Sequence, residues 1–471
     1  MFTETFPYHV MNDAAVCSSY GMRVQRAIDA VTADGKGKDI VRKRLAVGRR
    51  SLAKGIIAGA VASVVLTGCG GGQASDSQPT AAAVDPNSGD RATGNVTMCG
   101  HADASGVNGG TAAAFSEQNP DVQAEYVEIG ATTDQSRTQQ VQRLEAESTE
   151  CDVFLMDVTW VSEFATQNWV LDQSAVVEGL KDEAIPSTLE TAFYEGKYWA
   201  TPFYTNASLI YYAPDKVAKP ETWQQLYSEA SKGADTGFVY QGQQYEGLTV
   251  NFLELLYSAG GSVLDDDGNV TIDSAETREV LDFMATGIEN GAAPRAVLTF
   301  DENATRIAYE TGEYGYQRNW PHVYRLLNET PLADEFAVAP LPSWEGSGEA
   351  SGVLGGWNMA ISAYSENPEA AVALINFATS PDWQKRVAVD YSQAPMNEAA
   401  YDDTEVLEAM PFAQELRQSV EAAKPRPTSP VYPQISQAIY DNVYSVISGE
   451  TGSEAAVQKM VEEIEAAQET F

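Results

Sequence analysis

The region after Gly94 alternates between short apolar strands and amphipathic helices, and this alternation limits the possible folds more than any other feature of the sequence. Residues 95–99 (NVTMC), 122–129 and 152–156 (DVFLM) have the pattern of strands, and residues 111–118 and 133–148 between them have the pattern of helices. A strand–helix–strand–helix–strand order predicts a parallel, doubly wound α/β sheet. Ligands bind such sheets beyond the carboxyl ends of the strands, so residues 101–105 and 157–160 are expected near a binding site.

A second α/β region follows an extended, strand-rich crossing at residues 198–213. Thr222 is expected to cap a helix, and the chain is expected to cross back near residues 355–362. Helices are predicted around the apolar faces of 248–256 and 280–288, and over residues 367–378, 380–390, 432–447 and 453–468.

The first part of the chain has the pattern of an export signal. Residues 55–67 are an apolar run preceded by a basic segment, and the run is too short to span a membrane. Leu66-Thr67-Gly68-Cys69 follows, which indicates cleavage before Cys69 and a lipid on its thiol. We therefore expect a signal peptide with a long leader at 1–68, a flexible tether at 69–94, and a protein anchored at the outer face of the cell membrane. Whether export uses the general or the twin-arginine route stays open.

Charge and residue counts exclude several classes of function. With 67 Asp and Glu against 29 Lys and Arg, the formal net charge is −38, which disfavours nucleic acid and anionic lipid as partners. The three histidines (His9, His101, His322) include no pair at metal spacing, so neither a metal site nor a cofactor is expected. Cys99 and Cys151 would be the other cysteines of the mature chain beside Cys69, and the sequence leaves open whether they form a disulfide.

A group of acidic and amide residues has the spacing of a calcium loop. The group consists of Asp265, Asp267, Asn269, Asp273 and Glu276. Val270, however, occupies the position where the sharp turn of such a loop needs glycine. The alternative, which we favour, is a hairpin turn at Asp267-Gly268 and a helix cap at Asp273 or Ser274.

Three tryptophans lie beside Gly, Asn or Asp in segments that are expected to be loops. They are Trp160, Trp320 and Trp357. Indole rings stack on the C–H faces of sugars, while carboxylates, amides and guanidinium groups bind the hydroxyls. The pattern therefore favours a carbohydrate cleft. The abundant carboxylates also allow a glycoside hydrolase pair, although no particular two stand out.

Six segments in order resemble family 1 extracellular solute-binding proteins, the maltose- and trehalose-binding group of ABC importers, with actinobacterial trehalose-binding lipoproteins as the nearest likeness. The resemblance spans about 95–471 and rests on residues 152–172, 194–212, 245–261, 302–327, 352–362 and 424–436. It implies a periplasmic-binding-protein fold with two α/β lobes joined by hinge strands. One lobe would take 95–206 and 356–402, and the other 207–355 and 403–471.

The resemblance also implies a function and a set of ligand-binding residues. The protein would be a monomer without catalytic activity that captures a sugar and delivers it to the permease subunits of an ABC importer. Asp157 would accept sugar hydroxyls, Trp320 would stack on a ring, and Arg426 would donate a forked pair of bonds. The full expected set is Asp103, Gln135, Asp157, Tyr204, Asn206, Glu302, Trp320, Gly356, Trp357 and Arg426.

One departure from the family pattern bears on the size of the sugar. Maltodextrin binders of this group often carry Trp a few residues after the position of Val431-Tyr432, and this chain does not. The departure favours a neutral disaccharide, trehalose first, over long oligosaccharides. A polyamine or a phosphorylated solute is the other alternative, but the chain has few bases for a phosphate site.

Overall fold

The computed structural model describes residues 82–265, 267–347 and 350–470, all of which belong to the compact unit Ser77–Phe471. The expected signal peptide, the expected lipid site at Cys69 and the tether as far as residue 81 lie outside the described residues. Among the described residues, no helix combines the length and apolarity that crossing a membrane requires.

The last part of the expected tether is packed rather than free. Val84 N donates to Asp172 O (3.0 Å), and Asn376 Nδ2 donates to Pro86 O (3.0 Å). Gly89, in the short 3₁₀ helix Ser88–Arg91, lies so close to Ala373 that an added Cβ would be 2.8 Å from its backbone. The prediction of a flexible tether up to residue 94 is therefore wrong for residues 83–91, because glycine and small side chains let this segment pack on a helix.

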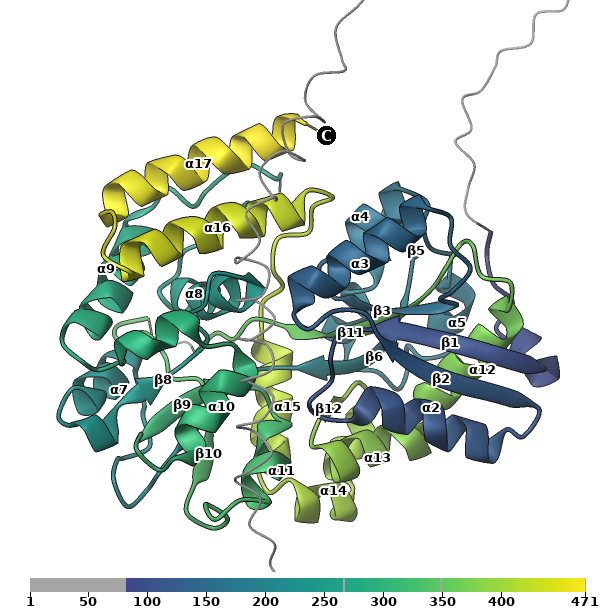
Figure 1. The fold of residues 1–471 in the computed structure, drawn as a ribbon, viewed down its shortest axis with the longest axis horizontal. Helices are drawn as coiled ribbons and strands as arrows, with labels where there is room; N and C mark the ends of the chain where they lie inside the picture. Colours follow the sequence, from purple (N-terminus) through teal and green to yellow (C-terminus); the bar gives the residue numbers. More distant parts are fainter. Residues whose placement is uncertain (1–81, 266, 348–349, 471) are drawn as a thin grey trace, which may run out of the picture. The chain divides into compact units, whose positions relative to one another are not determined.

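The first lobe is built on a six-stranded sheet with the order β12-β6-β11-β3-β1-β2 (Figure 1). Its strands are β1 (Gly94–Gly100), β2 (Val122–Glu128), β3 (Val153–Asp157), β6 (Thr201–Asn206), β11 (Gly355–Ile361) and β12 (Ala394–Pro395). As predicted, β1 pairs with β2 and β3 in parallel. The sheet is nevertheless mixed, because β11 runs antiparallel to both β3 and β6, and β12 antiparallel to β6. The chain leaves this lobe after β6 and returns through β11 at the same edge, so β11 must run the opposite way.

Helices cover this sheet on both faces, as expected for a doubly wound fold. Thr132 caps α3 through a bond from Gln135 N, and prolines start α12 and α13. The helices are α2 (Val107–Gln118), α3 (Thr133–Glu145), α4 (Val161–Thr166), α5 (Ser174–Glu178), α6 (Pro186–Glu190), α12 (Pro368–Ala378) and α13 (Pro381–Tyr391). The small hairpin of β4 (Phe193–Tyr194) and β5 (Lys197–Tyr198) lies between α6 and β6 in the sequence.

The second lobe is built on a four-stranded sheet with the order β10-β7-β9-β8. Its strands are β7 (Leu209–Tyr212), β8 (Phe238–Val239), β9 (Tyr316–Asn319) and β10 (Ala337–Pro340). Every residue of α8 (Glu246–Ser258) is buried, and α16 (Tyr432–Ile447) packs on it with α17 (Ser453–Glu469) alongside (Figure 1). The other helices of this lobe are α7 (Trp223–Ala230), α9 (Ala275–Glu289), α10 (Glu302–Glu310) and α11 (Val323–Asn328). Helix α14 (Thr404–Ala409) packs on α13, and α15 (Ala413–Ala422) contacts both β10 and β12.

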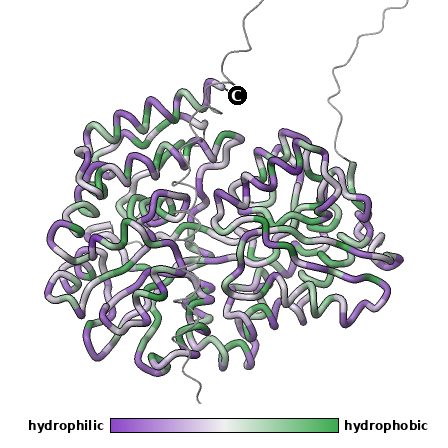
Figure 2. The backbone as a smooth tube through the Cα atoms, in the orientation of Figure 1, coloured by the Kyte–Doolittle hydropathy of each residue, from purple (hydrophilic) through white to green (hydrophobic). Residues whose placement is uncertain are grey.

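Apolar burial forms one large cluster around each sheet. Strands β3 and β11 are buried along their whole length, and Figure 2 shows hydrophobic stretches along the strands and hydrophilic ones in the outer turns. Cys99 and Cys151 form a disulfide in the apolar cluster of the first lobe, with their Cα atoms 5.8 Å apart. Cys151 precedes β3 and lies outside the strand ladder, so the strand register does not hold the two residues apart.

The calcium-like segment folds as the hairpin alternative. Asp265 Oδ1 accepts bonds from Asn269 N (2.8 Å) and Asp267 N (3.0 Å), and Gly268 adopts a φ of +82° in the turn. Ser274 caps α9 by accepting from Thr277 N (3.1 Å). Among the described residues, no group of carboxylate, histidine or cysteine side chains is arranged to hold a metal ion.

Candidate functional site

A cleft between the two lobes encloses about 1090 Å³ of empty space, part of it open to solvent. The carboxyl ends of β1, β3 and β6 supply its first-lobe wall, and the first turns of α8 and α10 supply much of the other. This is the edge at which doubly wound sheets bind their ligands. All but one of the residues expected to bind a ligand line it: Asp103, Asp157, Tyr204, Asn206, Glu302, Trp320, Gly356, Trp357 and Arg426.

Gln135 is the exception. Its side chain is exposed in the first turn of α3, where its Oε1 accepts a bond from Ala131 N (3.2 Å). Neighbouring Thr132 and Thr133 line the cleft instead. Gln135 does not line the cleft because its side chain turns back to satisfy the backbone that precedes its own helix.

The first-lobe wall combines a fixed carboxylate with an amide that lacks a partner. Asp157 Oδ1 accepts bonds from Thr159 N (3.0 Å) and Thr159 Oγ1 (2.7 Å), which fix the carboxylate at the end of β3. Asn206 Oδ1 is buried and has no hydrogen-bond partner among the described residues. A buried polar atom without a partner is costly, so this oxygen is poised to accept a bond from a ligand.

The three tryptophans have three different environments. The Arg318 guanidinium lies over one face of half-buried Trp320, 4.3 Å from the ring centroid, and Trp320 also lines the cleft. Trp357 is stacked on His101 at 3.8 Å between ring centroids, and it contacts Trp160 edge-on. Trp160 packs in the core of the first lobe. Of the three, Trp320 and Trp357 line the cleft, and Trp320 is the more exposed, which makes it the better candidate to stack on a ligand.

Arg426 is buried at the junction of the lobes. Its Nη2 donates to Asp157 Oδ1 (3.0 Å) in the first lobe, and its Nη1 donates to Glu246 Oε1 (2.6 Å) in the second. Burial by itself would lower the pKa of the Arg426 guanidinium. The interactions with Asp157, Tyr432 and Glu246 are stronger than this effect, so the pKa is raised. The forked pair of bonds that we expected Arg426 to give a ligand goes to two carboxylates, and its Nε, buried and unpartnered among the described residues, is left.

The carboxylates of two further predicted residues lie at the starts of helices. The Asp103 carboxylate accepts bonds from Ser105 N (2.9 Å) and Asn108 N (2.8 Å) at the start of α2. Glu302 is the first residue of α10, and burial raises the pKa of its carboxyl. Both side chains face the cleft, and both retain acceptor capacity for hydroxyl donors.

Gly355 and Gly356, at the start of β11, are required for packing. Gly356 has a φ of +126°, and a Cβ there would lie 2.5 Å from Tyr204 O, so the approach of β6 excludes any side chain. A Cβ on Gly355 would lie 3.0 Å from the Trp320 ring. The role of Gly356 is therefore to bring β11 and β6 together beneath the cleft, and Gly355 gives room to the indole.

The cleft is also lined by Glu246, Arg306 and His322, which were not predicted, and by His101, which was expected near the site but not among the ligand-binding residues. Burial lowers the pKa of His101 and of His322 to about 4, against the opposing charge of Asp103. Burial raises the pKa of Glu246 to about 7, although Arg426 opposes the shift. The positions of His101 directly after β1 and of His322 directly after the segment with Trp320 were available signals. Glu246 lies in the segment 245–261, one of the six that carry the family resemblance, but it was not singled out within that segment.

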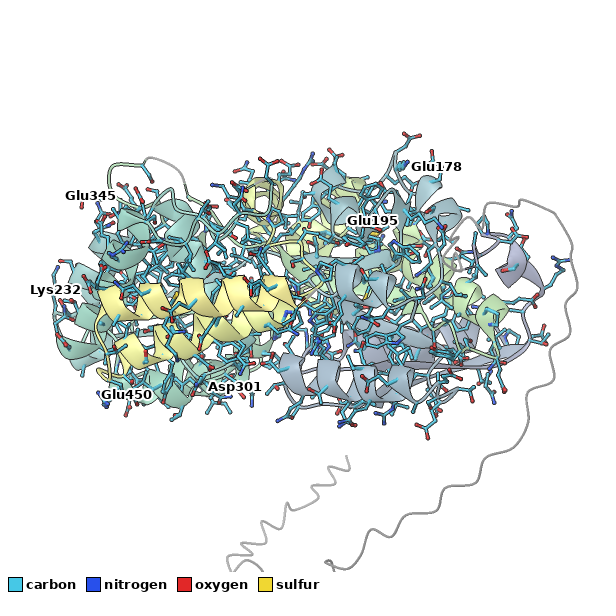
Figure 3. The ribbon with its side chains drawn as sticks, turned by 90° about the horizontal axis from the view of Figure 1, so that it is seen from above. Glu178, Glu195, Lys232, Asp301, Glu345 and Glu450 are labelled. Atoms are coloured by element: carbon cyan, nitrogen blue, oxygen red, sulfur yellow. A yellow bond between two sulfur atoms is a disulfide. The ribbon has the colours of Figure 1, made fainter. Side chains whose placement is uncertain are left out.

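The cleft is mostly neutral or acidic, and so is the outer surface. Figure 3 shows the labelled Glu178, Glu345 and Glu450 at the periphery, and all three are exposed. The two arginines that line the cleft, Arg306 and Arg426, are each paired with a carboxylate. The field therefore disfavours anionic ligands and leaves hydrogen bonding and stacking as the means of recognition.

Comparison with known proteins matches this geometry. The model of the family "Bacterial extracellular solute-binding protein" matches residues 101–385. A probable ABC transporter-binding protein of Deinococcus radiodurans is 33% identical over 340 residues, which cover 68% of this chain and 80% of the relative. A mannitol-binding protein of Pseudomonas aeruginosa is 23% identical over 334 residues, which cover 66% of this chain and 75% of the relative.

The solved structure of maltose-bound MalE3 from T. maritima aligns with a TM-score of 0.76 and 33% identity, and it covers 79% of this chain and 100% of that one. Its two-lobed fold is the fold described above. The family match spans more than half of the chain and includes parts of both lobes and most of the residues that line the cleft. This chain therefore belongs to the family of bacterial extracellular solute-binding proteins.

Proposed function

We propose that this protein captures a neutral disaccharide, trehalose first, in the cleft and delivers it to an ABC importer. The observation that carries the proposal is the composition of the cleft. It joins the half-buried indole of Trp320 to hydroxyl acceptors and to buried polar atoms that have no partner among the described residues. These atoms are His101 Nδ1, Asn206 Oδ1, Arg306 Nε, His322 Nδ1 and Arg426 Nε. A ligand with a C–H face and many hydroxyls satisfies both requirements.

The ligands of two similar proteins support this class of ligand. Maltose is bound in the T. maritima structure, and the P. aeruginosa relative is a mannitol-binding protein. The choice of a disaccharide rests on the departure at Val431-Tyr432. The Tyr432 hydroxyl donates to Glu246 Oε1 (2.6 Å), so this residue supports the cleft rather than extending it for a longer chain.

A glycoside hydrolase is the alternative from another class. It needs two carboxyl groups free to act on the sugar, one as an acid and one as a nucleophile or base. The most suggestive pair, Asp157 and Glu246, is instead bound on opposite sides of the Arg426 guanidinium. This arrangement supports binding without catalysis. Incubation of the protein with trehalose and maltose, followed by analysis for glucose, tests it, and release of glucose at enzymatic rates would favour the hydrolase.

Calorimetry against trehalose, maltose, sucrose, mannitol and longer glucans tests the proposed ligand. We expect the tightest binding for trehalose and weak binding for glucans of four or more units. A clear preference for another sugar would replace trehalose and keep the sugar-binding function. Heat with none of them, in protein shown to be folded, would remove the carbohydrate proposal.

The location and the organisation of the chain complete the proposal. We propose that Cys69 carries a lipid that holds a monomer at the outer face of the membrane, and that the lobes comprise 95–206 with 356–402 and 207–355 with 403–471. In a Cys69→Ala variant, incorporation of labelled lipid and sedimentation with membranes should both be lost. A variant that still incorporates lipid would contradict the assignment of the anchor.

A further inference from the structure

Glu246 lies where the second lobe meets Arg426, and no ligand-binding role was expected for it from the sequence. It is the first residue of α8, and only 7% of it is exposed. Its carboxylate accepts bonds from Arg426 Nη1 (2.6 Å), the Tyr432 hydroxyl (2.6 Å) and the Ser436 hydroxyl. The two hydroxyl donors from α16 fix this carboxylate, so it can in turn fix the guanidinium.

The other arm of Arg426 reaches across to the first lobe. Its Nη2 bonds to Asp157 Oδ1, and Asp157 is itself fixed by Thr159. The guanidinium therefore lies between one carboxylate from each lobe. Without a cation between them, Asp157 and Glu246 would repel each other when the lobes approach.

Glu246 makes a second contact across the cleft. The backbone N of Glu246 donates to Asp134 Oδ2 (3.2 Å), which belongs to α3 of the first lobe. Glu246 thus contacts the first lobe directly through its backbone and indirectly through Arg426. Opening of the cleft would break both the bond to Asp134 and the bond from Arg426 to Asp157.

We propose that Glu246 is the positioning residue that holds Arg426 on the second lobe, so that the guanidinium meets Asp157 only when the cleft closes and thereby stabilises the closed form. The inference rests on the proposed function for its link to ligand affinity, since a ligand that binds the closed form gains from any interaction that raises the population of that form. Glu246 touches Arg426 and acts on the ligand through it.

A pH profile separates this role from ordinary packing. The titratable groups that face Glu246 are Asp134 on α3, Asp157 after β3, Arg426, and Tyr432 and Tyr440 on α16. Because burial raises the pKa of Glu246 to about 7, its charge and its hold on Arg426 weaken as the pH falls from 8 to 6. We expect trehalose affinity to fall several-fold over this range in the parent protein.

The variant Glu246→Gln removes the charge with little change of shape. At pH 8 it should bind trehalose roughly tenfold or more weakly, the scale of one charged hydrogen bond, and it should lose the pH dependence between 8 and 6. Because Glu246 acts through Arg426, the double variant Glu246→Gln/Arg426→Ala should bind no more weakly than Arg426→Ala alone. Additive losses, or a parent whose affinity is constant between pH 8 and 6, would overturn the proposal.

Glu163→Gln is the matched control. It removes the charge from a partly buried Arg–Glu pair, Arg137 with Glu163, that lies within the first lobe. It should leave the affinity and its pH profile unchanged. An equal loss in this variant would show that any lost ion pair weakens binding, and the proposal would fall.

Small-angle X-ray scattering of the ligand-free protein tests the inference without any sugar. At pH 8, Glu246→Gln should have a larger radius of gyration than the parent and than Glu163→Gln, and the parent should expand at pH 6. Equal radii under all these conditions would overturn the role of Glu246 in closure. If no sugar binds the parent, the proposed function fails while the scattering result still decides for or against Glu246.

Discussion

Two buried arginines occupy opposite kinds of place in this protein. Arg318 lies inside the second lobe, where it is fully buried and bonds to Glu254, Ser208 and Gln241. Arg426 lies at the junction of the lobes and bonds to one carboxylate on each side. Both guanidinium groups are paired, but the partners of Arg318 move with it, whereas Asp157 belongs to the other lobe.

The difference shows how one type of interaction serves two purposes. Breaking the pair of Arg318 and Glu254 leaves a charge in an interior that cannot open to water, so that pair fixes the lobe and the indole of Trp320 above it. When the lobes move apart, Arg426 and Asp157 can each bind water in place of the other. The free energy of this pair is therefore available to set the balance between open and closed forms.

The largest expected effect tests the interior pair. Arg318→Ala leaves Glu254, which is fully buried, without its cation, and we expect the free energy of unfolding to fall by about 3–5 kcal/mol. Urea unfolding followed by fluorescence measures the loss. The double variant Arg318→Met/Glu254→Leu removes both charges and should recover most of it, and Arg426→Ala should cost less than half as much. Equal losses in the two arginine variants would break the comparison.

The tryptophans sharpen the same contrast between interior and cleft. Trp357→Ala opens a cavity between His101 and Trp160, so it should lower the free energy of unfolding by about 3 kcal/mol or more. Trp320→Ala should instead cost about 2 kcal/mol in sugar binding, roughly thirtyfold in affinity, with a nearly unchanged melting temperature. Calorimetry and thermal unfolding of both variants give the two quantities. A Trp320→Ala variant that is unstable yet binds normally when folded would assign that ring to packing.

Arg426→Ala tests the arginine at the junction through binding. We expect sugar affinity to fall by about 1.5–3 kcal/mol, because the variant loses a charged donor and leaves Asp157 and Glu246 facing each other. Titration calorimetry at pH 8 measures this change. Arg306→Ala is a useful comparison, since that arginine also lines the cleft but pairs within α10 with Glu310, and its loss should cost less. The reverse ranking would place the main cationic contact on α10.

The smallest expected effect concerns pH and the half-buried imidazole of His101. Burial lowers its pKa from 6.5 to about 4, so between these values the unfolded chain binds more protons and stability falls as the pH falls. Glu246 works the opposite way, because its raised pKa makes the folded state bind the extra proton. The difference in the free energy of unfolding between the parent and His101→Gln isolates the contribution of the histidine. We expect this difference to change by about 1–2 kcal/mol between pH 7 and pH 5. Parallel stability curves for the two proteins would contradict the assignment.

Much of the fold and of the cleft could be predicted, and the failures share a cause. Strands before His101 and Asp157 were predicted from apolar runs, and the cleft lies at their carboxyl ends. Gln135 and Trp160 do not line the cleft, and local sequence does not show whether a side chain turns to the ligand, to its own backbone or to the core. Glu246 was missed because its partners come from α16 and from the segment with Arg426, far away in the sequence.

The sequence by itself determined the alternation of strands and helices, the segments that cross between the lobes and the edge at which a ligand binds, because these depend on local periodicity and on the direction of parallel strands. Only the tertiary structure decided which indole in the cleft is the more exposed and which arginine spans the lobes. Those outcomes depend on contacts between segments more than a hundred residues apart, such as Arg426 with Asp157 and Glu246. Burial, rather than residue type, then decided which of these groups change their charge near neutral pH.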